Sequence, residues 1–184
     1  PMPYRNLASV LLQEQKTDEA REVLEAGVEQ TKGQPLLVTA LAGLLERTGE
    51  LDTAIENYEK ILTEQPDSPL VANNLAMLLI EYRDDPASLE RARELSEKLR
   101  GSEQPAFLDT LGWVRYKSGE YVEALEFLEK AVEGQPDSPV LRYHLGMAYF
   151  KSGNEVLAKD NLEQALASGD NFRGRDEAEA TLAE

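Results

Sequence analysis

The feature that most constrains this chain is a sequence repeat with a period of about 34 residues. A leucine followed by a small residue recurs at Leu7-Ala8, Leu41-Ala42, Leu75-Ala76, Leu111-Gly112 and Leu145-Gly146. A second small residue follows each pair, at Ala20, Ala54, Ala92, Ala124 and Ala158. A fixed period of this length indicates stacked repeats, each of which buries its apolar face against its neighbours.

Each repeat predicts two antiparallel helices. In the second repeat, apolar residues recur at helical spacing over residues 37–45, stop at Gly49 and resume over residues 51–62. A glycine between two helical patterns suits the left-handed backbone that ends a helix. The small residues lie where the two helices would cross, because a larger side chain there would hold the axes beyond the ~8–10 Å at which side chains interlock. The sequence therefore predicts an all-α fold.

This pattern resembles the tetratricopeptide repeat family. The resemblance is carried by the leucine–small pairs, the second alanine with a bulky residue after it, and the turn and closing residues Gly49, Gly119, Gly153, Pro66 and Pro136. It covers five units, at residues 1–34, 35–68, 69–104, 105–138 and 139–172, and implies a right-handed superhelical solenoid. Residues 173–184 hold few apolar side chains and are predicted to form a capping helix, so that 1–184 is expected to be one domain.

Two units depart from the family pattern. In the first unit, Gln15 stands where three later units have a turn glycine. The third unit has a longer loop, predicted over residues 81–90, which contains Asp84-Asp85-Pro86. We interpret these two acidic residues as turn and helix-start residues rather than as a metal pair. The departures bear on the local packing of the two units and leave the fold class unchanged.

Composition excludes several classes of function. The chain has 35 acidic and 19 basic residues, with a net charge of −16, so it repels nucleic acid and anionic membrane surfaces. It has no run of about 18 apolar residues, which argues against direct membrane insertion of this fragment. Its start, Pro1-Met2-Pro3, resembles neither a native initiator nor a signal peptide. We therefore expect a fragment of a longer protein.

The sequence contains no motif typical of a catalytic, metal-binding or phosphate-binding site. Cysteine is absent, and the only histidine, His144, cannot assemble the usual zinc ligand set alone. No GxxxxGK or GxGxxG phosphate-binding loop occurs. We therefore expect no catalytic residue, no cofactor and no metal site, and a polar packing or groove role for His144.

The resemblance implies that the first helix of each unit lines the concave side of the solenoid. Following the helical period gives a face that begins with Arg5, Ser9, Leu12, Gln13, Thr39, Gly43, Glu46 and Arg47. From this face we predict a partner-binding surface of aromatic, methionine and flanking polar residues: Asn73, Met77, Asp109, Trp113, Tyr116, Lys117, Tyr143, Met147, Phe150 and Lys151. The alternative interpretation is that the aromatic side chains among them pack on neighbouring helices and only stabilise the stack.

The predicted function is a non-catalytic scaffold that binds a protein or peptide partner in the concave groove. Some members of the family bind the C-terminal carboxylate of chaperone tails with Lys, Asn and Arg side chains on the first helices. We do not expect this clamp here, because only Asn73 and Arg5 have a suitable side chain at the corresponding positions. The alternatives are a regulatory or substrate-recruiting arm of an enzyme whose catalytic part lies elsewhere, and self-stacking through an uncapped N-terminal helix pair.

A narrower resemblance concerns the cellular setting. The stretches Asn73-Asn74-Leu75-Ala76, 108–113 and Gly174-Arg175-Asp176 are similar to the C-terminal part of large bacterial tetratricopeptide lipoproteins. This resemblance implies a role in exopolysaccharide export or in PEP-CTERM surface-protein sorting. It leaves the compartment open between the bacterial cytoplasm and the periplasm, with a membrane-tethered parent protein.

Overall fold

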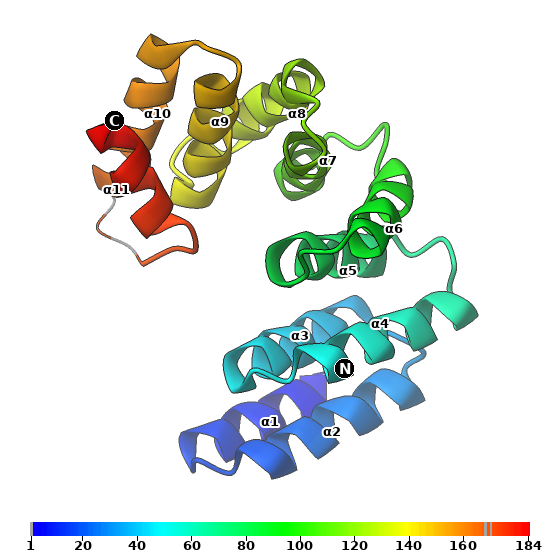
Figure 1. Cartoon of the computed structure of the whole chain (residues 1–184). Coiled ribbons are helices and arrows are strands. Elements are labelled where there is room, and N and C mark those ends of the chain that lie inside the picture. Colours follow the sequence, from blue (N-terminus) through cyan, green and yellow to red (C-terminus); the bar gives the residue numbers. More distant parts are fainter. Residues whose placement is uncertain (1, 168, 170) are drawn as a thin grey trace. The chain divides into compact units, whose positions relative to one another are not determined.

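The computed structural model describes residues 2–167, 169 and 171–184, and every regular element in these ranges is an α-helix (Figure 1). The all-α prediction is therefore confirmed. The helices are α1 (Met2–Gln13), α2 (Thr17–Gln30), α3 (Pro35–Thr48), α4 (Leu51–Glu64), α5 (Pro69–Tyr82), α6 (Pro86–Glu97), α7 (Pro105–Lys117), α8 (Tyr121–Gly134), α9 (Pro139–Lys151), α10 (Glu155–Ala167) and α11 (Arg175–Ala183).

The helices divide into two compact units, Pro1–Arg83 and Asp84–Glu184. In the first unit, each of the helices α1 to α4 packs on the next, and the first helices α1, α3 and α5 also lie side by side. In the second unit, successive helices from α6 to α11 pack on one another, and α9 contacts both α7 and α11. The boundary falls inside the third predicted repeat, and the single domain over 1–184 stays a prediction.

The small residues of the repeat lie where neighbouring helices approach most closely. Four of the second alanines, Ala20, Ala54, Ala92 and Ala124, are at most 1% exposed. A Cβ atom added to Gly112 would lie 2.5 Å from the Leu128 Cγ atom and 3.0 Å from the backbone oxygen of Ala124. Only glycine fits there, because the facing backbone cannot move aside as a flexible side chain could.

The loop of the third repeat is shorter than predicted. We predicted it over residues 81–90, but α5 continues to Tyr82 and α6 begins at Pro86. The early start of α6 has a local cause. The Asp85 carboxylate accepts a hydrogen bond from the Ser88 backbone N–H at 2.9 Å, and proline suits the first helical position. Asp85 is thus a helix cap, as its sequence context indicated.

The turn between α1 and α2 has Gln15 where three later repeats have a turn glycine. Gln15 has φ of 62°, close to the 76°, 79° and 85° of Gly49, Gly119 and Gly153 at the same repeat position. The left-handed turn is therefore kept although the residue that adopts it most easily is missing.

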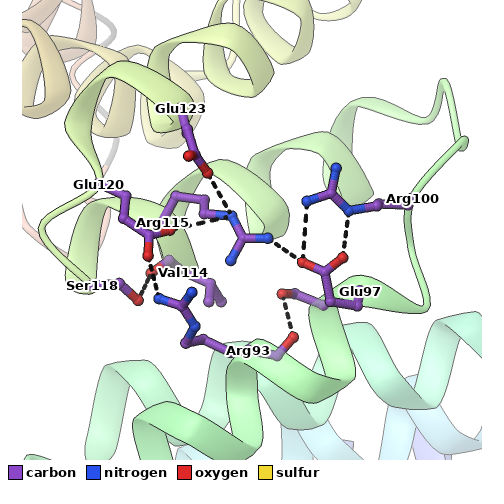
Figure 2. A network of polar contacts seen from close by, with 9 residues as sticks. Arg93, Glu97, Arg100, Val114, Arg115, Ser118, Glu120 and Glu123 are labelled. Carbon is purple, nitrogen blue, oxygen red and sulfur yellow. Dashed lines mark hydrogen bonds and ion pairs between the residues drawn. The ribbon is translucent and has the colours of Figure 1, made fainter.

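A buried arginine joins three helices of the second unit (Figure 2). Arg115 on α7 is 4% exposed, and its guanidinium donates a hydrogen bond to the Glu97 carboxylate at the end of α6. Its Nε atom lies 3.5 Å from a carboxylate oxygen of Glu120 and 3.5 Å from one of Glu123. Arg93 on α6 extends the network by donating to Glu120 at 2.6 Å. The network fixes α6 against α7 and the start of α8.

No helix in the described part of the chain is long and apolar enough to cross a membrane.

Candidate partner-binding surface

The first helix of each repeat carries a face that does not pack on its own second helix. We call it the first-helix face and define it by two repeat positions: Arg5 and Ser9 in α1, Thr39 and Gly43 in α3, Asn73 and Met77 in α5, Asp109 and Trp113 in α7, and Tyr143 and Met147 in α9. This face is open in part of the first unit and buried in the second, so each unit is described by itself.

In the unit Pro1–Arg83, the first-helix face of α1 and α3 is an open groove of about 500 Å³. Its lining is mostly small or polar: Arg5, Ala8, Ser9, Leu12, Leu24, Thr39, Ala40, Gly43 and Arg47. The groove exists because short side chains stand at three of the four defining positions of α1 and α3, at Ser9, Thr39 and Gly43. A Cβ atom added to Gly43 would meet no atom within 4 Å, so this glycine faces open space in the middle of α3.

Two cations line this groove. Arg5 and Arg47 are both exposed, and neither forms an ion pair within the described residues. Other arginines of the same unit are engaged, since Arg21 pairs with Glu50 and Arg83 pairs with Asp52. A guanidinium presents several N–H donors in a planar fork that matches a carboxylate. The groove can therefore bind an acidic group beside a short apolar segment.

The α5 part of the first-helix face is nearly closed. Asn73 is buried, and its side-chain amide donates to the Asn74 side-chain oxygen at 3.2 Å. Met77 is half-buried. We predicted both as partner-binding residues, and the structure leaves only Met77 with appreciable surface.

In the unit Asp84–Glu184, the first-helix face of α7 and α9 is filled with aromatic side chains. Trp113 stacks on Tyr116, with ring centroids 4.3 Å apart, and on His144, with centroids 3.9 Å apart. The His144 Nδ1 atom lies 2.7 Å from the Asp109 carboxylate, and both side chains are buried. His144 thus has the polar packing role that the sequence indicated, between α9 and α7.

The chain's own C-terminal segment covers the α9 part of this face. Tyr143 donates a hydrogen bond to the Glu177 carboxylate at 2.6 Å, and its ring lies 5.7 Å from the ring of Phe172. Thr181 donates to the Met147 sulfur at 3.6 Å. Burial raises the pKa of the Tyr116 hydroxyl to about 12, with a smaller contribution from the nearby Glu177 carboxylate.

The predicted exposure of the aromatic patch is therefore wrong. Trp113, Tyr116, Tyr143 and Met147 are at most 8% exposed, and Asp109 is 5% exposed. The helical period placed them correctly on the first-helix face, but contacts between α7 and α9 and the cover from residues 172–181 remove them from solvent.

Three predicted residues keep accessible surface at the rim. Phe150 is half-buried, whereas Lys117 and Lys151 are exposed. The Lys117 ammonium lies 4.9 Å from the centre of the Trp113 ring, and the Lys151 ammonium lies 5.5 Å from that of Phe150. Such cation–π contacts hold each lysine over an aromatic ring. Their role in partner binding stays a prediction.

From the sequence we placed Arg5 and Arg47 on the concave side of the first helices but did not select them as a site. The signal that could have found them is the run of small residues around them, Ala8, Ser9, Ala40 and Gly43, which leaves room for a ligand. The expectation of no metal site remains an expectation, and the described residues show no group of three potential metal ligands.

Comparison with known proteins settles the family. Three family models described as "Tetratricopeptide repeat" match residues 1–26, 35–78 and 115–176. The chain belongs to the tetratricopeptide repeat family. A tetratricopeptide repeat protein of this architecture is a protein–protein interaction scaffold, and members of the family are generally non-catalytic.

Individual relatives share the repeat at low identity. The chain is 26% identical over 76% of its length to the TPR repeat-containing protein PA4667 of Pseudomonas aeruginosa, of which it spans 23%. It is 23% identical over 85% of its length to the Cellulose synthase operon protein C of Pseudomonas fluorescens, of which it spans 13%. The tetratricopeptide protein TTC0263 of Thermus thermophilus has the same fold, with a TM-score of 0.72, 19% identity, and coverage of 100% of this chain and 99% of that one.

Proposed function

We propose that this tetratricopeptide domain is a non-catalytic scaffold that binds a protein or peptide partner on its first-helix face. The observation that carries the proposal is the open groove of α1 and α3, in which Arg5 and Arg47 flank a floor of small and apolar residues.

Charge narrows the kind of partner. A carboxylate of the partner would pair with Arg5 or Arg47, while an apolar side chain would lie on the half-buried Leu12. The net charge of −16 would repel a strongly acidic protein at long range. We therefore infer a short segment with one or two acidic residues next to apolar ones. Lys117 and Lys151 remain candidates for a second contact with such groups.

Filling the groove tests this proposal. Gly43→Leu places a side chain into open space, so the fold should be retained or stabilised by up to about 1 kcal/mol through helix propensity. Twelve-residue peptides selected on the full chain from a displayed library should contain Asp or Glu. They should lose at least tenfold in affinity for Gly43→Leu and for the pair Arg5→Gln/Arg47→Gln.

The matched controls introduce a leucine, or remove two cations, at exposed positions outside the groove. Glu56→Leu introduces a leucine at an exposed position of α4, and Lys130→Gln/Lys159→Gln removes two exposed cations from α8 and α10. Neither variant should weaken the selected peptides. Equal binding of those peptides to Gly43→Leu and to the unmodified chain would place the partner site elsewhere.

The cellular setting that we infer is a bacterial exopolysaccharide export or surface-protein sorting system. The similarity to the Cellulose synthase operon protein C supports this setting, and the chain spans a small part of that protein.

A second candidate function, self-stacking, rests on the outer side of α1. Leu7 and Val10 are 50% and 49% exposed, whereas Leu41 and Leu44, at the same repeat positions of α3, are 4% and 2% exposed. The same positions in α5, α7 and α9 are also buried. The second helix of the preceding repeat packs on each of these first helices, so a similar helix of another copy could cover Leu7 and Val10.

For self-stacking we expect the mass in light scattering to rise from one chain toward two at tens of micromolar. The pair Leu7→Gln/Val10→Gln should then remain monomeric. The control pair Val122→Gln/Val156→Gln, at two valines that are 73% and 78% exposed, should self-associate like the unmodified chain. A single-chain mass for the unmodified protein at all these concentrations would rule the candidate out.

A further inference from the structure

The C-terminal helix α11 lies on α9 at the repeat positions where a partner would bind a first helix. Tyr143 and Met147 occupy these positions, and they contact Glu177 and Thr181 of α11. On α1 and α3 the same positions, from Arg5 to Gly43, line an open groove. The repeat itself therefore does not require a cover there. On α9 the cover removes the large side chains of Tyr143 and Met147 from water, which is favourable.

The segment that provides this cover is weakly held. Helix α11 has nine residues, and among them only Ala178 is buried. Isolated helices shorter than about 12–15 residues are marginal in water, so α11 depends on its contacts with α9 and α10. Its acidic residues Asp176, Glu177 and Glu179 are exposed. Displacing α11 therefore removes little buried apolar surface from the helix itself.

The contacts between α11 and α9 show which features of a helix fit this surface. The Tyr143 hydroxyl donates to a carboxylate, and Ala178, the residue after that glutamate, is buried. Thr181, one helical turn beyond Glu177, reaches the Met147 sulfur. At Gly174 the backbone lies so close to the Tyr143 ring that a Cβ atom would overlap it. These features describe a short helix with an acidic residue, a small residue next to it and a hydroxyl one turn later.

We propose that the Tyr143–Met147 surface of α9 is a helix-binding site, that α11 is its resident ligand, and that a partner displaces α11 with a short acidic helix of the same pattern. This site is separate from the groove of α1 and α3. A tethered segment acts at a local concentration on the order of millimolar, so α11 sets a threshold that a partner must exceed. A partner that binds weakly therefore does not displace α11, whereas a partner that binds tightly does.

The experiment exposes the site in the 184-residue chain and adds the same segment as a separate peptide. Ala178→Glu places a carboxylate at the one buried position of α11 and should undock it. Ala180→Glu adds the same charge at an exposed position of the same helix and is the matched control. The probe is a fluorescein-labelled synthetic peptide of residues 171–184 with its natural sequence. Its affinity for Ala178→Glu should exceed that for the unmodified chain and for Ala180→Glu by at least tenfold.

Recognition of the carboxylate is checked on both partners. A Glu177→Gln peptide should bind Ala178→Glu about tenfold more weakly than the natural peptide, because a charge-assisted hydrogen bond is replaced by a neutral one. Adding Tyr143→Phe to Ala178→Glu should weaken the natural peptide by a similar factor. The acidic peptides selected on the α1–α3 groove should be unaffected by all these variants, which separates the two sites.

Three results would overturn the proposal. The peptide could fail to bind Ala178→Glu although near-ultraviolet circular dichroism shows Trp113 still packed. Ala178→Glu could instead unfold the whole unit Asp84–Glu184, which would make α11 an integral part of its core. The peptide could also bind the unmodified chain and Ala178→Glu equally, which would place it on a different surface.

Discussion

Truncating Trp113 to alanine is expected to destabilise the unit Asp84–Glu184 by about 3–5 kcal/mol. Trp113 is the largest fully buried side chain of the described residues, at 1% exposure. It stacks between Tyr116 and His144 and contacts Tyr143 at 5.7 Å between ring centroids. Removing the indole opens a cavity between α7 and α9 that the two helices can fill only partly, because His144 is also held by Asp109.

Urea unfolding followed by circular dichroism at 222 nm measures this loss. The matched control is Val122→Ala, which shortens a 73% exposed side chain on α8 and should change stability by less than about 0.5 kcal/mol. Phe150→Ala should lie between the two, since that side chain is half-buried. A Trp113→Ala loss below about 1 kcal/mol would mean that the indole is not packed in solution, and the surface interpretation of Trp113 would then regain support.

The helices could be predicted because the same apolar and small residues recur in each repeat. The leucine of each pair is buried in α3, α5, α7 and α9, and a small residue follows it where the helices cross. Both recur with one period, so a single unit specifies the others. Gly112 shows how local this information is, since the fit against Leu128 is visible in the sequence as a glycine within a helical pattern. The loop before α6 was misjudged because the cap formed by Asp85 outweighed the weak apolar pattern there.

The exposure of the candidate site could not be predicted in the same way. Helical period gives the direction of Tyr143 and Met147 around α9, but not what another segment places over them. That cover comes from Phe172, the last residue of the fifth unit, and from Glu177 and Thr181 beyond the repeats, about 30 residues further along the chain. The groove of α1 and α3 was missed because we selected large side chains as contacts and did not consider the space that Ser9, Ala40 and Gly43 leave open.

Replacing Arg115 by methionine is the second change with a large expected effect, a loss of about 2–3 kcal/mol in the unit Asp84–Glu184. The other four repeats have Leu11, Leu45, Leu79 and Tyr149 at this position, so a single buried cation stands in an apolar series. Methionine matches the apolar neighbours in volume. It nevertheless leaves the carboxylates of Glu97, Glu120 and Glu123 close together without the cation between them (Figure 2).

The same substitution at Arg100 is the matched control. Arg100 pairs with the same Glu97 carboxylate, but its side chain is 54% exposed, against 5% for Arg115. Exposed ion pairs contribute about 0–1 kcal/mol, so Arg100→Met should cost less than about 1 kcal/mol. The fluorescence of Trp113, the only tryptophan, reports unfolding of this unit in both variants. Equal losses for the two variants would show that burial of Arg115 adds nothing to the network.

The dependence on pH separates loss of charge pairing from loss of packing. The hydrogen bond from Arg100 lowers the pKa of Glu97, burial opposes this shift in part, and Arg115 lowers the pKa further. A lowered pKa stabilises the fold above the ordinary value of 4.5, and that stability is lost as the pH falls through the lower folded value. The difference between the unmodified chain and Arg115→Met should therefore be larger at pH 7 than at pH 3.

Neutralising the stranded carboxylates should reverse much of the damage. Arg115→Met combined with Glu97→Gln and Glu120→Gln removes the cation together with two of its three carboxylate partners, and replacing both sides of an ion pair costs less than removing one side. We expect this triple variant to recover more than half of the loss at pH 7 and to show little dependence on pH. If it is no more stable than Arg115→Met alone, the guanidinium contributes through its packing and α6 is held against α7 by shape rather than by charge.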